Sequence, residues 1–357
     1  MMKVSDRRPE NREALIDAAK GIGILCVFLG HLVPYDSPVF RVIFNFHMPL
    51  FFFLSGMLFD PLRDTEPHAM LRRVWRTIGI PAVFFTLLGT VICVLTGQFL
   101  RNNLMDWVRV GASFFHGSPE YGGSIWFLTC LADAHIAFWF WCRYRQGKDN
   151  RFATPLFILS MYVLGFVGGT CIHPKILLGT PLMICSAPMA IVYYALGYYL
   201  KNRLRNILAA LQARRLIPLV VATLLLAIEI PISLCDCSPN LAIPEFHAFF
   251  AFPVASALGI AAILSVAASP IAGTALRFVG RFSLYYFLLE RWSQATWMAL
   301  CKTSFPSLLP AATTANTNVT EFSALQIAIF MTFIVISETA VIPLLKPLLC
   351  QCKRRFG

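Results

Sequence analysis

Charged residues are scarce in this sequence. They make up 13% of its 357 residues, while 57% are hydrophobic, against roughly 25% charged and 45–50% apolar in a soluble domain. This scarcity excludes a soluble globule, and the apolar content excludes a disordered chain. Apolar runs of about 20 residues, the length that crosses a bilayer, recur along the chain and indicate a multi-pass membrane protein.

The sequence also lacks the pattern of a cleaved signal peptide. Its first apolar run begins near Ala14 and contains Asp17 and Lys20, which the apolar core of a signal peptide would not carry. We therefore expect this run to be a retained first span. No internal repeat is visible and no loop is long enough for a second domain, so we expect one membrane domain over residues 1–357.

The apolar runs predict an all-α integral membrane fold, a single bundle of about ten transmembrane helices. When the loops are placed alternately on the two sides, most Lys and Arg residues share a side with the N-terminus. The positive-inside rule makes that side the cytoplasm, so both termini are expected there. The net charge of +12 then reflects topology, not nucleic-acid binding. The predicted spans are about 14–33, 38–59, 78–96, 125–142, 152–170, 181–200, 216–235, 243–268, 278–300 and 322–350.

The first span carries a polar stripe. Lys20 and His31 are eleven residues apart, close to three helical turns, so they share a face about 16 Å apart along the axis. Asp17 lies one turn before Lys20. Ionisable residues inside a membrane indicate function by default. The alternative for each residue alone is an interfacial ion pair, or a histidine at the helix end.

The second span contains Asn45, His47 and Pro49. Because Pro49 has no N–H, the carbonyl of Asn45 loses its helical partner and becomes an available acceptor at mid-depth. A buried structural histidine is the alternative interpretation of His47. Just after this span, Arg73 and Arg76 are spaced to place two guanidinium groups side by side for a phosphate, although cytoplasmic loops are commonly basic.

Further polar and aromatic residues lie in later spans. Trp126 opens the fourth span, and Ser283, Tyr286 and Glu290 share one face of the ninth. Most of these groups fall toward one half of the bilayer. They predict a polar cavity open to the outside.

These motifs resemble the acyltransferase-3 family of membrane acyltransferases, most closely its branch of fucose-O-acetylase-like and polysaccharide O-acetyltransferases. The resemblance rests on Asp17-x-x-Lys20-Gly21, Gly30-His31, the run from Phe46 to Gly56, Arg73-x-x-Arg76, Ile125-Trp126-Phe127-Leu128 and Gly280-Arg281-Phe282-Ser283. It implies a bacterial inner (plasma) membrane enzyme that takes an acyl group, usually acetyl, from cytoplasmic acyl-CoA. The acceptor would be a sugar hydroxyl of an envelope or exported polysaccharide or glycolipid at the outer face.

The resemblance also implies roles for single residues. His31 would be the essential histidine, with Lys20, Arg73 and Arg76 binding acetyl-CoA. Asp17, His47 and Glu290 complete the expected catalytic set, and Trp126, Asn45 and Tyr286 the substrate-binding set. The match departs from the family at Lys20, which is Arg in many relatives, and near Glu290, where many relatives carry His.

Two chemistries and two functions remain open from the sequence. A histidine can abstract the proton of the acceptor hydroxyl, or it can be acylated and pass the group on. The alternative function is a transporter or flippase for a small metabolite or a lipid-linked glycan, but the inverted repeats typical of carriers are not seen. The expected partners are acyl-CoA, a glycan or lipid-linked sugar and the lipid bilayer, without nucleic acid or metal; homo-oligomerisation is left open.

Overall fold

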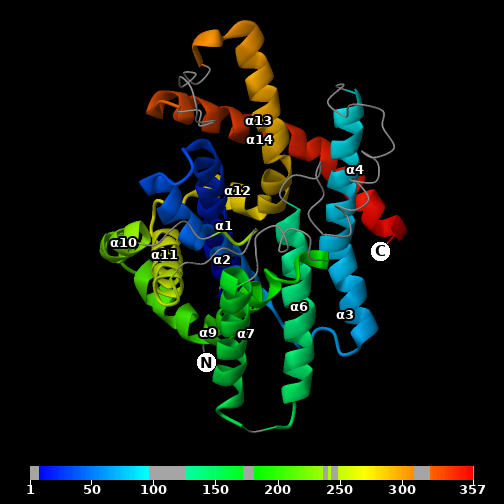
Figure 1. Ribbon diagram of the computed structural model, residues 1–357, viewed down its shortest axis with the longest axis vertical. Helices are drawn as coiled ribbons and strands as arrows, with labels where there is room; N and C mark the ends of the chain where they lie inside the picture. Colours follow the sequence, from blue (N-terminus) through cyan, green and yellow to red (C-terminus); the bar gives the residue numbers. More distant parts are fainter. Residues whose placement is uncertain are drawn as a thin grey trace, which may run out of the picture.

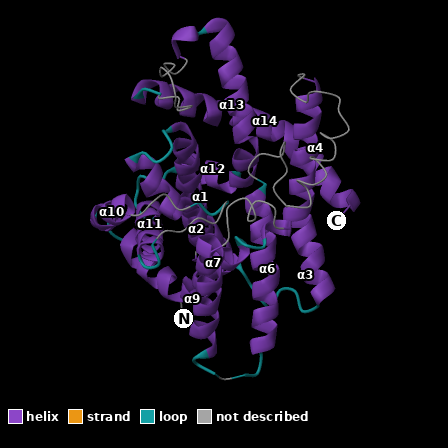
Figure 2. Ribbon diagram, in the orientation of Figure 1, coloured by secondary structure: helices purple, strands orange, loops and turns teal. Residues whose placement is uncertain are grey.

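A computed structural model describes residues 8–95, 125–148, 150–171, 181–235, 240–242, 248–308 and 322–356. Within these ranges the secondary structure is helical, without β-strands (Figures 1 and 2). The elements are α1 (Arg8–Leu32), α2 (Pro38–Leu58), α3 (Pro67–Val74), η1 (Trp75–Gly79), α4 (Ile80–Leu95), α6 (Trp126–Arg145), α7 (Ala153–Cys171), η2 (Pro181–Met183), α9 (Ala187–Gln212), α10 (Ile217–Cys235), α11 (Ala251–Ala267), α12 (Thr274–Arg281), α13 (Ser283–Ser304), η3 (Pro306–Leu308) and α14 (Ala324–Phe356).

The all-α membrane class expected from the sequence agrees with this architecture. Every predicted span overlaps a helix, although residue 96 and residues 243–247 of two spans lie outside the described ranges. Five of the described helices are long and apolar enough to cross a membrane by length and composition. The total of ten spans and the side on which each terminus lies remain predictions.

The helices differ in how they use their apolar surface. Most of α1 and α2 is buried, whereas only a small part of α7, α10 and α14 is buried. In Figure 1, α1 and α2 lie centrally, with α10 and α11 on one side and α4 and α6 on the other. Exposed apolar side chains on the outer helices, such as Leu156, Leu224 and Leu344, suit contact with lipid. The inner pair is therefore available to carry polar side chains.

Glycine allows the central helices to pack closely. A Cβ on Gly280 of α12 would lie 1.6 Å from the carbonyl oxygen of Asp17, and one on Gly21 would lie 2.1 Å from that of Leu276. Both distances are far shorter than van der Waals contact, so only glycine permits this crossing of α1 and α12. The crossing fixes the middle of α1, from which Lys20 projects.

Proline shapes α2 as the sequence predicts. Pro49 lies inside the helix, and the carbonyl of Asn45, which has no N–H partner at Pro49, accepts a hydrogen bond from Ser256 Oγ of α11 at 2.5 Å. Asn45 Nδ2 donates to the carbonyl of Arg41 and to Ser233 Oγ, both at 2.9 Å. Ser233 in turn donates to Glu229 Oε1 at 2.5 Å. These bonds attach α2 to α10 and α11 inside the bundle.

Candidate active site

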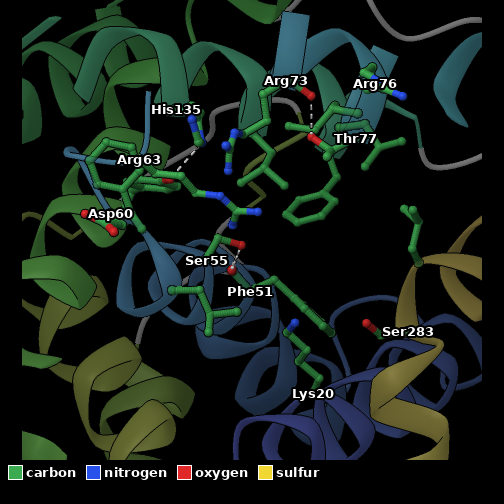
Figure 3. A pocket seen from close by; sticks show the side chains of 18 of the residues that line it. Lys20, Phe51, Ser55, Asp60, Arg63, Arg73, Arg76, Thr77, His135 and Ser283 are labelled. Atoms are coloured by element: carbon green, nitrogen blue, oxygen red, sulfur yellow. Dashed lines mark hydrogen bonds between the residues drawn. The ribbon is translucent and has the colours of Figure 1, made fainter. Parts of the chain in front are cut away.

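A cavity of about 910 Å³ opens beside the end of α2 (Figure 3). Its upper rim is formed by α3 and η1, and α1 and α13 contribute Lys20 and Ser283 from the opposite side. Six basic side chains line it, against two carboxylates, so it attracts anions. We call it the basic cavity; its charged lining residues are Lys20, Arg63, Arg72, Arg73, Arg76 and Lys353 with Asp60 and Asp64.

The segment after α2 forms one wall of the basic cavity and is fastened from two neighbouring helices. Lys201 Nζ of α9 donates to the carbonyl of Phe59 at 2.9 Å. From α6, Trp139 Nε1 donates to the carbonyl of Asp64 at 3.0 Å, and Arg143 Nη2 to that of Thr65 at 2.5 Å. Three backbone carbonyls are thus held by side chains, which positions Arg63 and Asp64 at the cavity.

The two arginines singled out in the sequence have different surroundings. Arg73 forms a two-point ion pair with Asp64, with Nε 2.6 Å from Oδ2 and Nη2 2.8 Å from Oδ1. Within the described part of the chain, no carboxylate pairs with Arg76. Arg76 lies in η1, a π-helical turn between α3 and α4, and such turns are frequent at functional sites. Arg76 therefore has its charge available for a ligand, whereas Arg73 also holds the loop.

A second cavity of about 280 Å³ lies around His31. We call it the histidine cavity. His47 and Trp126 line it as well, so it brings together three of the residues expected at the site. The rest of its lining is mainly aromatic and apolar: Tyr35, Phe40, Phe44, Met48, Leu241 and Phe287, with Asn240 and Ala242.

Glu290 holds the ring of His31. Its Oε1 lies 2.6 Å from His31 Nδ1 and joins residues 259 positions apart in the chain. Gln294 Nε2 donates to the same oxygen at 3.0 Å. The His31 side chain is 34% exposed, whereas that of Glu290 is 3% exposed. In the tautomer in which Nδ1–H donates to Glu290 Oε1, Nε2 is the basic nitrogen of the neutral ring.

His47 is placed differently. Its Nδ1 donates to the carbonyl of Ile43 at 2.8 Å, and the ring of Phe44 lies next to both imidazoles, with centroids 6.2 Å from His31 and 4.6 Å from His47. Among the described hydrogen bonds, Glu290 and not His47 orients His31. His47 contributes to the wall of the histidine cavity.

Glu290 and three other expected site residues line neither cavity. Asn45 is buried and takes part in the hydrogen bonds that join α2 to α10 and α11. Tyr286 is fully buried, with its hydroxyl 2.5 Å from Thr339 Oγ1 of α14. Asp17 Oδ2 lies 3.6 Å from Arg281 Nε at the crossing of α1 and α12. The geometry gives these residues contacts that hold helices together.

Several lining residues were not singled out as site residues from the sequence. In the sequence, Arg63 and Lys353 count only toward the excess of basic residues in two segments expected on the cytoplasmic side. They are 290 positions apart, yet both line the basic cavity. The C-terminal end of α14 comes alongside α4 (Figure 1), which brings Lys353 to the basic cavity. His135 lines that cavity too and bonds through Nδ1 to the Tyr194 hydroxyl at 2.9 Å. The excess of basic residues was the only signal in the sequence for Arg63 and Lys353. That they line the same cavity follows only from the packing of the helices.

Comparison with known proteins decides the family. The family described as Acyltransferase domain matches residues 13–337, which contain both ends of the site. The chain belongs to the acyltransferase-3 family. The resemblance found in the sequence motifs is thereby confirmed, and the protein is a membrane acyltransferase by family and by its apolar helices.

Two curated relatives of this acyltransferase-3 protein share its sequence in part. Both are named Nodulation protein NolL. The protein from Sinorhizobium fredii is 32% identical over 133 residues, 34% of each chain. The protein from Mesorhizobium japonicum is 28% identical over 204 residues, 53% of this chain and 48% of its own. The chain thus matches about a third to a half of the length of these relatives, and no solved structure matches it.

Proposed function

We propose that this protein is a transmembrane O-acyltransferase. It moves an acyl group, acetyl in the simplest case, from cytoplasmic acyl-CoA to a sugar hydroxyl of a glycan at the outer face of the bacterial inner membrane. The observation that carries the proposal is the pair His31 and Glu290, 2.6 Å apart. His31 lines the histidine cavity, which shares a wall residue with the basic cavity.

The basic cavity suits the donor. Acyl-CoA carries several phosphate charges, and phosphate is favoured by clustered Arg and Lys side chains. The lining of the basic cavity supplies such groups from Arg63, Arg72, Arg76 and Lys353, and from Lys20 of α1. The positive-inside bias assigns this end to the cytoplasm, where acyl-CoA is available. Passing only the acyl end inward avoids moving phosphate charges through hydrocarbon.

The histidine cavity suits the transfer step. With Glu290 bound at Nδ1–H, Nε2 of His31 can take the proton from an acceptor hydroxyl. The oxygen then attacks the thioester carbonyl, a C–O bond forms, the C–S bond breaks, and the proton passes to the CoA sulfur. The same nitrogen can instead attack the thioester, so that an N–C bond forms, the C–S bond breaks and CoA leaves as the thiolate. The acceptor hydroxyl then attacks the acyl group, a C–O bond forms, the N–C bond breaks, and the hydroxyl proton passes to the thiolate. Glu290 stabilises the positively charged ring in both routes.

The lining of the histidine cavity supports a sugar as the acceptor. Sugars present apolar C–H faces together with hydroxyl groups, and aromatic walls with a few polar groups bind such ligands. Trp126, Tyr35, Phe40 and Phe44 provide aromatic surface around His31 and His47. The acceptor hydroxyl would then lie against a wall that leaves Nε2 accessible.

The test uses membrane vesicles from host cells that lack the gene and carry plasmid-borne variants. With labelled acetyl-CoA, the wild-type protein should place alkali-labile label on the envelope glycan, and Glu229→Gln, a buried glutamate away from both cavities, should do so too. His31→Ala should place none. Label on the glycan with His31→Ala would refute the role of His31, and a wild-type protein that moves solute without consuming acetyl-CoA would be a transporter.

A further inference from the structure

Phe287 of α13 is the one described residue that lines both cavities. Its side chain is buried, with 5% of its surface exposed. One turn further along α13 lies Glu290, the partner of His31. The ring of Phe287 therefore stands between the basic cavity and the paired side chains at which the transfer is proposed.

Two other helices, α1 and α2, also contribute residues to both cavities. On α1, Ile24 lines the basic cavity and His31, seven residues later, lines the histidine cavity. On α2, which runs the opposite way, Met48 lines the histidine cavity and Phe51, three residues later, lines the basic cavity. The three residues on α2 correspond to about 4.5 Å of rise, and the seven on α1 to about 10.5 Å. The cavities thus lie end to end, separated by a partition of about one to two helical turns.

The partition is made of aromatic rings. Phe287 packs edge-on against Phe127 of α6, with centroids 5.2 Å apart and planes at 68°. The ring of Phe127 also packs against those of Phe52 and Phe51, with centroids 4.9 Å and 5.9 Å apart. Next to it on α6, Trp126 faces the histidine cavity while Phe127 faces the basic one. A phosphate cannot cross such a wall, but an uncharged acyl thioester can pass between rings that rotate.

We propose that Phe287, together with Phe127, determines which acyl groups this enzyme transfers, by limiting the space for the acyl chain between CoA and His31. This inference rests on the proposed O-acyltransferase function. The rings pack against one another across the partition, so each further methylene group adds volume that has to pass between them. Discrimination by packing of this kind is worth about 10- to 200-fold per methylene group in other enzymes.

The proposal is tested with the same host vesicles, which carry the native acceptor, and with acetyl-, butyryl- and hexanoyl-CoA offered singly. Mild alkali releases the ester-linked acyl groups from the glycan, and mass spectrometry measures each. For Phe287→Ala we expect the ratio of butyryl to acetyl transfer to rise at least tenfold over the wild-type ratio, with a smaller rise for Phe287→Leu and Phe127→Leu. The graded Leu variants cover the case in which Phe287→Ala does not accumulate.

The matched control is Phe330→Ala. Phe330 is equally buried, at 2% exposed, and stacks on Trp297 away from both cavities, so its substitution should leave the ratio unchanged. An unchanged ratio in the Phe287 and Phe127 variants, with active wild-type protein, would overturn the inference and leave the proposed function standing. Wild-type vesicles that transfer no acyl group from any of the three donors would overturn both.

Discussion

His31 Nδ1 and Glu290 Oε1 lie 2.6 Å apart, although one residue ends the first long helix and the other lies near the middle of α13. The carboxylate is buried and the imidazole is partly open to the histidine cavity. This is the arrangement of a base held by an orienting carboxylate. The predictions below concern this pair, the contacts around the basic cavity and the crossing of α1 and α12.

Glu290→Gln should keep the size of the side chain and remove its charge. We expect kcat for acyl transfer to fall roughly 10²- to 10⁴-fold, because the amide neither fixes the Nδ1–H tautomer nor stabilises the charged imidazole. KM for acetyl-CoA should change little, since Glu290 lies beyond the partition from the basic cavity. Kinetics in host vesicles provide the measurement, with Glu229→Gln as the buried-glutamate control. A Glu290→Gln protein with full kcat would contradict the role assigned to the pair.

Arg76→Ala and Lys353→Ala should each weaken binding of acyl-CoA. A hydrogen bond to a charged group contributes about 1.5–3 kcal/mol, so Kd should rise roughly 10- to 100-fold. Binding should also weaken as salt is added, because screening reduces the attraction between cations and phosphates. Isothermal titration of purified protein measures both effects. Arg205→Ala, an exposed arginine of α9 outside the cavity, should bind as the wild type; equal losses in all three variants would assign the effect to net charge.

Arg73→Ala should lower the free energy of unfolding by about 2 kcal/mol, because it leaves the mostly buried carboxylate of Asp64 without its two-point partner. Removing both partners in Arg73→Ala with Asp64→Ala should cost less than the two single losses added together. Asp36→Asn, in the exposed pair with Arg41, should cost less than about 1 kcal/mol. Thermal unfolding in detergent gives the comparison. Strict additivity of the two changes at Arg73 and Asp64 would show that the pair does not hold the loop.

Gly280→Ala should destabilise the bundle by about 1–3 kcal/mol or prevent its assembly, because the added methyl group would overlap the carbonyl of Asp17. Gly168→Ala is the matched control, since a Cβ there meets nothing within 4 Å. Size-exclusion profiles and melting temperatures of the two variants test this. Equal behaviour would mean that the close crossing of α1 and α12 does not exist in the folded protein.

Local patterns in the sequence were sufficient for much of the fold. Hydropathy located the helices, and the absence of an N–H at Pro49 predicted the acceptor that Ser256 fills at Asn45. Of the polar stripe expected on α1, Lys20 and His31 line the two cavities, whereas Asp17 lines neither. These features depend only on spacing within one segment.

The site itself depends on contacts between distant segments, which local patterns do not indicate. Nothing local indicates that Glu290 meets His31, that Asp64 pairs with Arg73, or that Lys353 reaches the basic cavity. Tyr286 lies one turn before Glu290 on the same face of α13, yet its hydroxyl contacts Thr339 Oγ1 of α14, while Glu290 contacts His31 of α1. Spacing identifies which residues share a face; the packing of the other helices decides what that face meets.

The central claim is that His31, oriented by Glu290, transfers an acyl group from CoA to a glycan hydroxyl. The most direct measurement is the amount of alkali-labile acetyl on the envelope glycan of cells that lack the gene and express the wild-type protein, His31→Ala or Glu229→Gln at equal levels. We expect acetyl on the glycan with the wild-type and Glu229→Gln proteins and none with His31→Ala. Acetyl on the glycan at wild-type amounts with His31→Ala would contradict the central claim.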